Sequence, residues 1–256
     1  SLLLFLLHQW KTEQLSDQDL KSCLDDFCSF VLRRTICGMQ TRQYDRLFPT
    51  AIKQAKGDTR QDLREYWLNR GWPADNHLQE QLTETPIYKS YGSLTHMLLS
   101  RIEQSYGHKE RVAVKDLTIE HVMPQTLNES WENMLGEDWF QKHQRWVHTI
   151  GNLTLTGYNS ELSNSDFITK RDSHLANSNL KLNQYFTRHE EWNPETIRER
   201  AIDLAGRIAD IWQGPAESET LGGSSGDSRH NVTTSSVNVE VIREFSINRI
   251  QRRLDL

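Results

Sequence analysis

The spacing of apolar residues changes near Gly107, and this change limits the folds open to the chain. Before Gly107, apolar positions recur at helical spacing, as on one face of an amphipathic helix. One such stripe contains Leu20, Leu24, Phe27, Cys28, Val31 and Leu32. After Gly107, Val112 and Val114 alternate with polar neighbours, and Leu117 and Ile119 continue the alternation. The pattern predicts a mainly α protein with a small β-hairpin, in the α+β class.

Capping residues predict where several helices begin and end. Ser16 with Asp19 resembles a capping box, and Asp58 or Thr59 can cap a second helix. Asn193 followed by Pro194 is typical of an N-cap and a first helical position. The expected helices cover residues 16–34, 44–56, 58–67, 87–102, 129–149, 165–170 and 194–212, and a β-prone segment covers residues 152–156.

The length of 256 residues allows one large domain or two small ones. We expect a helical region over residues 1–110 and a second domain over residues 111–213. Residues 214–236 are mostly Gly, Ser, Thr and other polar residues, which predicts a flexible linker. Residues 237–256 are amphipathic; they can dock on the body of the protein or pair with another chain, as in a homodimer.

The composition indicates a cytoplasmic protein. Cys23, Cys28 and Cys37 lack the spacing of a zinc site, so we interpret them as buried free thiols in a reducing compartment. The apolar start of the chain is far shorter than the ~20 residues that span a bilayer, and it lacks the features of a signal peptide. We expect no membrane partner, and we interpret the start as the stub of a longer chain. The net charge of −5 argues only weakly against DNA, because local patches decide binding.

The candidate chemistry lies in the segment Asp-Leu-Thr-Ile-Glu-His-Val-Met-Pro-Gln at residues 116–125. Glu120 and His121 are neighbours at the end of an expected strand. A carboxylate can hold a divalent cation, and an imidazole can take a proton from water. Asn159, on a later element, can complete the cation site. This combination suits the cleavage of a phosphodiester bond.

The order strand, acid-histidine, strand, asparagine and helix resembles the HNH (His-Me finger) nucleases, whose core is a ββα-metal motif. The more specific resemblance is to the C-terminal domain of GmrSD-type modification-dependent restriction proteins, and SspE of phosphorothioate-linked phage defence is similar. It covers roughly residues 112–212. The residues that carry it are 119–125, Gly151-Asn152-Leu153-Thr154-Leu155, Asn159, Leu162-Ser163-Asn164, Phe167 and Lys170.

The resemblance implies a role for each residue of the motif. His121 is implied to be the general base, and Glu120 and Asn159 the protein ligands of Mg²⁺ or Mn²⁺. Asn152 is implied to bridge the hairpin strands and to hold the His121 loop in position. The distance in sequence from His121 to Asn152 is longer than in compact HNH motifs, and Glu120 stands where many relatives have aspartate.

Four further residues are candidates for contact with DNA or with the scissile phosphate. His148 can contact that phosphate, or it can cap the end of a helix. Lys170, followed by Arg171, can bind a backbone phosphate, or both can lie on a solvated helix face. Asn164 is a DNA-contact candidate that can equally serve as an N-cap near Ser165. The tryptophans Trp131, Trp139 and Trp146 are interpreted as core residues.

The sequence therefore predicts a metal-dependent DNA endonuclease domain of a bacterial anti-phage restriction system. A single centre of this kind cuts one strand, so a monomer is expected to nick. The resemblance also implies an upstream ParB-like nucleotide-hydrolysing module in the same protein. The alternative is a catalytically decayed DNA-binding or regulatory module that contacts that upstream module, and RNA is a further possible substrate.

Overall fold

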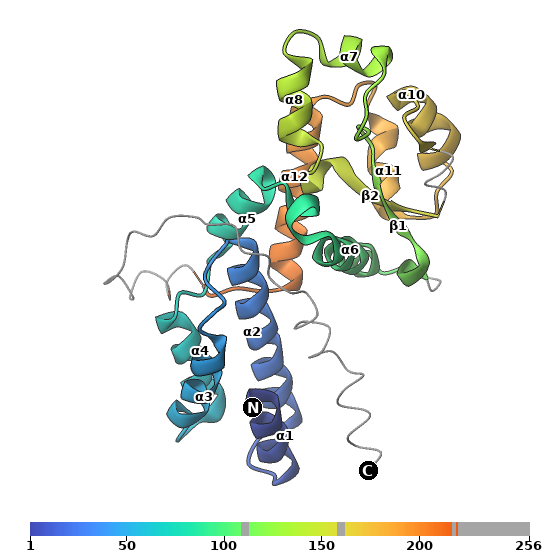
Figure 1. Ribbon diagram of the computed structural model, residues 1–256. Coiled ribbons are helices and arrows are strands. Elements are labelled where there is room, and N and C mark those ends of the chain that lie inside the picture. The colour runs from blue at the N-terminus through green and yellow to red at the C-terminus, as the bar shows by residue number, and fades with distance from the viewer. Residues whose placement is uncertain (109–112, 158–161, 217–218, 220–256) are drawn as a thin grey trace. The chain divides into compact units, whose positions relative to one another are not determined.

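The computed structural model describes residues 1–108, 113–157, 162–216 and 219, and Figure 1 shows their elements. Within these residues the chain divides into two compact units. Unit 1 contains residues 1–82 and the described residues from 205 onward, and unit 2 contains the described residues from 83 to 204. The expected boundaries after residues 110 and 213 stay predictions. The expected C-terminal segment 237–256, and most of the expected linker, lie outside the described residues.

Unit 1 is helical. Its elements are α1 (Leu2–Lys11), α2 (Asp17–Ile36), α3 (Tyr44–Gln54), α4 (Thr59–Asn69) and most of α5 (Asp75–Glu84). The expected caps are present: the side chain of Ser16 accepts a hydrogen bond from the amide of Asp19, and Asp58 accepts one from the amide of Gln61. These side chains satisfy amides that have no partner within the helix. The helix α5 was not expected from the sequence.

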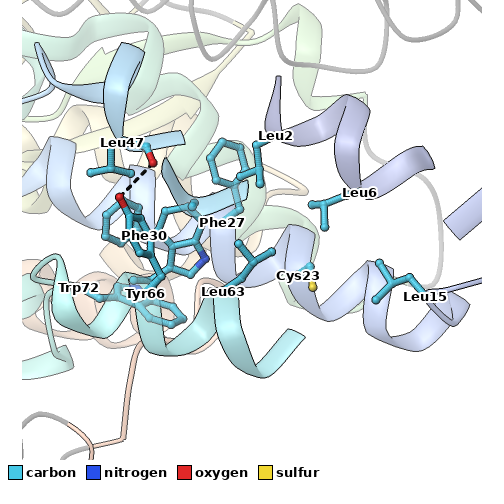
Figure 2. Packing of buried hydrophobic residues seen from close by; sticks show 12 residues of the cluster. Leu2, Leu6, Leu15, Cys23, Phe27, Phe30, Leu47, Leu63, Tyr66 and Trp72 are labelled. Atoms are coloured by element: carbon cyan, nitrogen blue, oxygen red, sulfur yellow. Dashed lines mark hydrogen bonds between the residues drawn. The ribbon is translucent and has the colours of Figure 1, made fainter. Parts of the chain in front are cut away.

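The core of unit 1 is built around Trp67, which is fully buried. Phe27, Phe30 and Tyr66 all lie with their ring centroids within 6.2 Å of the Trp67 ring. Figure 2 shows this cluster, in which side chains from several helices gather. The prediction that all three thiols are buried is wrong for Cys28, which is exposed, because its position on α2 faces away from this core. Cys23 is buried and Cys37 is partly exposed.

Unit 2 contains the β-hairpin. β1 (Thr118–His121) pairs antiparallel with β2 (Leu153–Thr156), and His121 stands opposite Leu153. The helix α6 (Ile87–Ser105) and the short helix α11 (Lys181–Gln184) pack against β2 (Figure 1). The remaining elements are η1 (Val114–Asp116), α7 (Glu129–Leu135), α8 (Trp139–Trp146), η2 (Ile150–Asn152), α10 (Phe167–Lys170), η3 (Arg171–Leu175), η4 (Tyr185–Arg188) and α12 (Pro194–Ile211), whose last residues belong to unit 1.

The core of unit 2 contains the expected tryptophans. Trp131 and Trp146 are buried, and Trp139 packs partly buried against the same cluster. The single helix expected over residues 129–149 is instead two helices, α7 and α8. They are separated at Gly136, whose φ of +68° is a left-handed conformation that ends α7. Residue 112, where the alternation begins, lies outside the described residues, and from residue 113 onward the first strand begins at Thr118.

The prediction of a mainly helical protein with a small antiparallel hairpin is confirmed. The finer prediction of a ββα-metal core stays a prediction. Asn193 caps α12 as expected, because its Oδ1 accepts from the amide of Thr196 at 3.1 Å. In the part of the chain that the structure describes, no helix combines the length and the apolar character needed to cross a bilayer.

Candidate active site

Three rings from three segments of unit 2 meet at the end of β1. The Nε2 atom of His121 lies 3.2 Å from the Nδ1 atom of His148. The ring of Tyr88, from the first turn of α6, lies edge-on to the His121 ring at 4.5 Å and stacks on the His148 ring at 5.8 Å. The two predicted histidines are therefore brought together, and an unpredicted tyrosine encloses them.

His148 is the more exposed of the two histidines. It follows α8, and its carbonyl accepts a hydrogen bond of 3.2 Å from the amide of Tyr88, which ties the start of α6 to the end of α8. His148 is partly exposed, whereas His121 is buried with 5% of its surface accessible. An approaching water molecule or phosphate therefore meets His148 before it meets His121.

Both histidines are held in their neutral form. The pKa of His121 is lowered to about 3, first by burial and then by the positive charges of His148, Lys170 and His143. The pKa of His148 is also lowered, by burial and by the charges of Lys89 and His143. A neutral imidazole has one ring nitrogen that donates a hydrogen bond and one that accepts one, so at pH 7 each ring keeps an unprotonated nitrogen.

Asn152 fixes the loop that follows His121. Its Oδ1 accepts from the amide of Met123 at 2.8 Å and from the Nε1 of Trp192 at 3.0 Å. Its Nδ2 donates to the carbonyls of Met123 and Val147, each at 2.9 Å. The side chain is fully buried, and each of its polar atoms has two partners. These contacts bridge the segments after β1 and before β2, and the catalytic role of Asn152 stays a prediction.

The segment before β2 is held from its other side by α12. The Nη1 of Arg200 donates to the carbonyls of Gly151 and Leu153, both at 2.7 Å. Arg200 is fully buried, and burial lowers its pKa to about 10, so it remains charged at pH 7. A Cβ added at Gly151 would stand 2.0 Å from the carbonyl oxygen of Ile197, so only glycine permits this approach.

Glu120 lies on the other face of β1, because successive strand residues point to opposite faces. Its Oε1 accepts from the Nζ of Lys170 at 2.6 Å, and the same ammonium donates to the carbonyl of His121 at 3.0 Å. Both side chains are buried. Burial raises the pKa of Glu120 and lowers the pKa of Lys170, and the ion pair opposes both shifts. A phosphate contact by Lys170 stays a prediction; its ammonium is enclosed here.

The contacts of two other predicted residues, Arg171 and Asn164, do not involve the rings. Arg171 pairs with Asp172 at 2.6 Å and with Glu190 at 3.1 Å. Asn164 is exposed, and its carbonyl accepts from the Nδ2 of Asn128. Asn159 lies outside the described residues. Contacts of these three residues with DNA or metal stay predictions.

Sequence reasoning missed three residues that build the site: Tyr88, Arg200 and His143. The Nε2 of His143 bonds the carbonyl of Pro124 at 2.9 Å and so holds the far end of the His121 loop. Tyr88 and Arg200 lie in helices. The sequence around an aromatic residue or an arginine in a helix does not indicate which residue it contacts in the folded protein. His143 carries a weak signal, since it lies near His148 in sequence.

The comparisons with known proteins agree with the resemblance found in the sequence. A family model described as GmrSD restriction endonucleases, C-terminal domain, matches residues 72–207. No curated protein and no solved structure matches the chain. The matched segment contains His121, His148 and Asn152 and covers more than half of the 256 residues. The chain therefore belongs to the family of GmrSD restriction endonuclease C-terminal domains.

Proposed function

We propose that this restriction endonuclease domain hydrolyses phosphodiester bonds of DNA, with His121 as the general base. The observation that supports it most directly is the pair of neutral imidazoles at the end of β1, with nitrogen atoms 3.2 Å apart. A general base must be unprotonated at the working pH, and it contributes about 10²–10⁴-fold to the rate.

His148 acts with His121 in this proposal. The Nδ1 of His148 occupies the accessible side of the His121 Nε2, so the attacking water first contacts His148. The water gives its proton to the imidazole pair, and its oxygen attacks phosphorus. The bond from phosphorus to the leaving oxygen then breaks, and that oxygen takes up a proton. Tyr88 excludes bulk water from one side of the pair.

The resemblance implies Mg²⁺ or Mn²⁺, and the described residues do not fit the implied ligand set. Glu120 points away from the His121 ring, and an ammonium at 2.6 Å already neutralises its carboxylate. Within the described ranges, no group of three His, Cys, Asp or Glu residues is placed to hold a cation. We therefore derive no step through a metal. Dependence on Mg²⁺ or Mn²⁺ stays a prediction, as does a ligand role for Asn159.

The biological setting is part of the same proposal. We infer that the domain serves a bacterial anti-phage restriction system, downstream of a ParB-like nucleotide-hydrolysing module in the same protein. One pair of histidines in each chain suits the cutting of one strand, so a monomer nicks, and a double-strand break needs two copies.

A plasmid assay tests the proposal. The wild-type chain, His121→Ala and His148→Ala are incubated with supercoiled plasmid in Mg²⁺, in Mn²⁺ and in EDTA. Exposed His77 provides a matched control, as His77→Ala. We expect His121→Ala to lose at least about 10²-fold in the rate of open-circle formation, and His77→Ala to match the wild type. Equal rates for His121→Ala and the wild type would refute the proposal.

The alternative function is a DNA-binding or regulatory module without catalysis. The observation that favours it is the enclosure of His121, which is only 5% exposed beneath His148 and Tyr88. Binding of labelled DNA without cleavage in any cation would support this alternative. The same assay with single-stranded RNA separates a DNA nuclease from an RNA nuclease.

A further inference from the structure

A hollow of about 360 Å³ lies in unit 1, apart from the histidine pair. It forms where the start of α3 meets the end of α4, and Arg42, Arg46 and Arg70 line it with Asp45, Gln43 and Thr50. The charged lining residues give a local charge of +2, from three arginines and one aspartate. The whole chain carries −5, so this concentration of positive charge runs against the balance of the protein.

The three guanidinium groups have no ion-pair partner among the residues that the structure describes. Within the described part of the chain, no ion pair joins Arg42, Arg46 or Arg70 to a carboxylate. Other arginines of unit 1 behave differently: Arg33 pairs with Asp75 at 2.6 Å, and Arg64 with Asp26 at 3.0 Å. Asp45, the one acid in the hollow, accepts from the amide of Arg46 at 3.0 Å.

The hollow is held in shape by bonds beneath it. The guanidinium of Arg70 lies over the ring of Tyr66, 5.1 Å from its centroid. The Tyr66 hydroxyl donates to the carbonyl of Leu47 at 3.1 Å, which joins α4 to α3 and is the dashed line in Figure 2. Arg34, from α2, donates to the carbonyls of Arg70 and Gly71 at the end of α4. The position of the Arg70 side chain, and the junction of α3 with α4, are therefore set before a ligand arrives.

We propose that this hollow binds a phosphate ester group. Guanidinium groups form paired hydrogen bonds to phosphate oxygens, and the side-chain amide of Gln43 adds a neutral donor. The volume is within the range of ligand sites, which begins near 300 Å³. Such a ligand comes from one of two sources, the DNA backbone or a free nucleotide. The site is separate from the histidine pair, so the inference does not depend on hydrolysis.

Binding measurements on the full chain, without divalent cations, test the proposal. The probes are a labelled DNA duplex of about 20 base pairs, ATP and pyrophosphate. The variants are Arg42→Gln, Arg46→Gln, Arg70→Gln and the triple variant. Arg60→Gln is the matched control, because Arg60 is an arginine of unit 1 that pairs with Asp19 outside the hollow.

We expect each single variant to raise the Kd of the recognised probe about three- to tenfold, and the control to change it less than about twofold. If the arginine variants lose binding of the duplex alone, the source of the ligand is the DNA backbone. If the arginine variants lose binding of ATP and pyrophosphate, the source of the ligand is a free nucleotide. If the triple variant is folded by circular dichroism and binds all three probes as the wild type does, the proposal is wrong; it is also wrong if the wild type binds none. Arg46→Lys, which keeps the charge but cannot form the paired hydrogen bonds, should recover only part of the affinity that Arg46→Gln loses.

Discussion

The close packing around Gly151 leaves no room for a side chain at this position. A Cβ at this position would stand 2.0 Å from the Ile197 carbonyl oxygen and 3.0 Å from the Ala201 Cβ. Gly151→Ala must therefore move η2 away from α12 and strain the Arg200 hydrogen bonds. We expect it to lower the free energy of unfolding by about 3 kcal/mol, as measured by urea denaturation, and to lower cleavage activity.

Gly206 provides the control for this substitution. It lies in α12, the helix that Gly151 approaches, and a Cβ there has no neighbour within 4 Å. Gly206→Ala should be neutral or stabilise the helix by up to about 1 kcal/mol, because alanine loses less backbone entropy than glycine. Equal effects of the two substitutions would show that the close approach at Gly151 is not what requires glycine.

The buried neutral His121 should make stability depend on pH. Its pKa is about 3 in the folded protein and about 6.5 in the unfolded chain. Between these values only the unfolded chain binds the proton, so its contribution to stability is complete above pH 6.5 and is lost as the pH falls toward 3. From pH 7 to pH 5 the wild type should lose about 2 kcal/mol more than His121→Asn. Parallel urea titrations at both pH values measure this; identical losses would contradict a buried neutral imidazole.

The sequence located the candidate residues of the site better than it located the residues that support them. His121, Asn152 and His148 stand in or near one motif, so local reasoning found them, and the structure brings His121 and His148 into contact. The resemblance implies a phosphate contact for Lys170, and the local pattern equally allows a solvated helix face. Its partner Glu120 is 50 positions away in the chain, and no local pattern reveals that pairing.

Helices were predictable where a cap marks their start. Ser16, Asp58 and Asn193 each accept the hydrogen bond expected of an N-cap. The failures occurred where backbone conformation or tertiary contacts decide: Gly136 breaks the expected helix over residues 129–149, and α5 was not expected. The hairpin was predictable as a type of element. Its strands are only four residues each, too short for the alternation of side chains to fix their ends.

The attachment of α10 to β1 by the buried Glu120–Lys170 pair can be tested by removing one partner. Lys170→Met leaves a buried carboxylate without its cation, which should cost about 3–5 kcal/mol in the free energy of unfolding. The double variant Glu120→Leu/Lys170→Met removes both charges and should be more stable than Lys170→Met alone. Urea denaturation gives both values, and a double variant no more stable than Lys170→Met would mean that the two charges are not coupled. Lys142→Met, which loses one bond to the Leu135 carbonyl, is the control and should cost about 1 kcal/mol or less.

The same variants decide whether Glu120 binds metal. If Lys170 merely blocks a cation site, Lys170→Met frees the carboxylate, and added Mn²⁺ should then raise the Tm of this variant more than that of the wild type. We expect no such difference, because Glu120 and the His121 ring lie on opposite faces of β1. A larger Mn²⁺ shift in Lys170→Met would restore Glu120 as a ligand.

The chain as a whole combines an acidic balance with two separate hydrophobic cores. Unit 1 is centred on Trp67, and unit 2 contains Trp131 and Trp192, all fully buried. The length alone left one large domain or two small ones open, and apolar spacing does not distinguish residues of one core from those of another. The net charge of −5 did not indicate where positive charge is concentrated, and so it did not reveal the three arginines that line one hollow.

This distribution of charge predicts how DNA binding responds to salt. Each phosphate contact releases counterions and contributes about −0.9 to the slope of log K against log salt. The overall charge of an acidic chain does not favour DNA binding, so a few local contacts should determine the slope. If the hollow holds backbone phosphates, the triple arginine variant should have a slope smaller in magnitude by about 3, and Arg46→Gln a slope smaller by about 1. Anisotropy titrations of a DNA duplex over a range of KCl concentrations measure both. Slopes that match the wild type would place the phosphate contacts elsewhere in the chain.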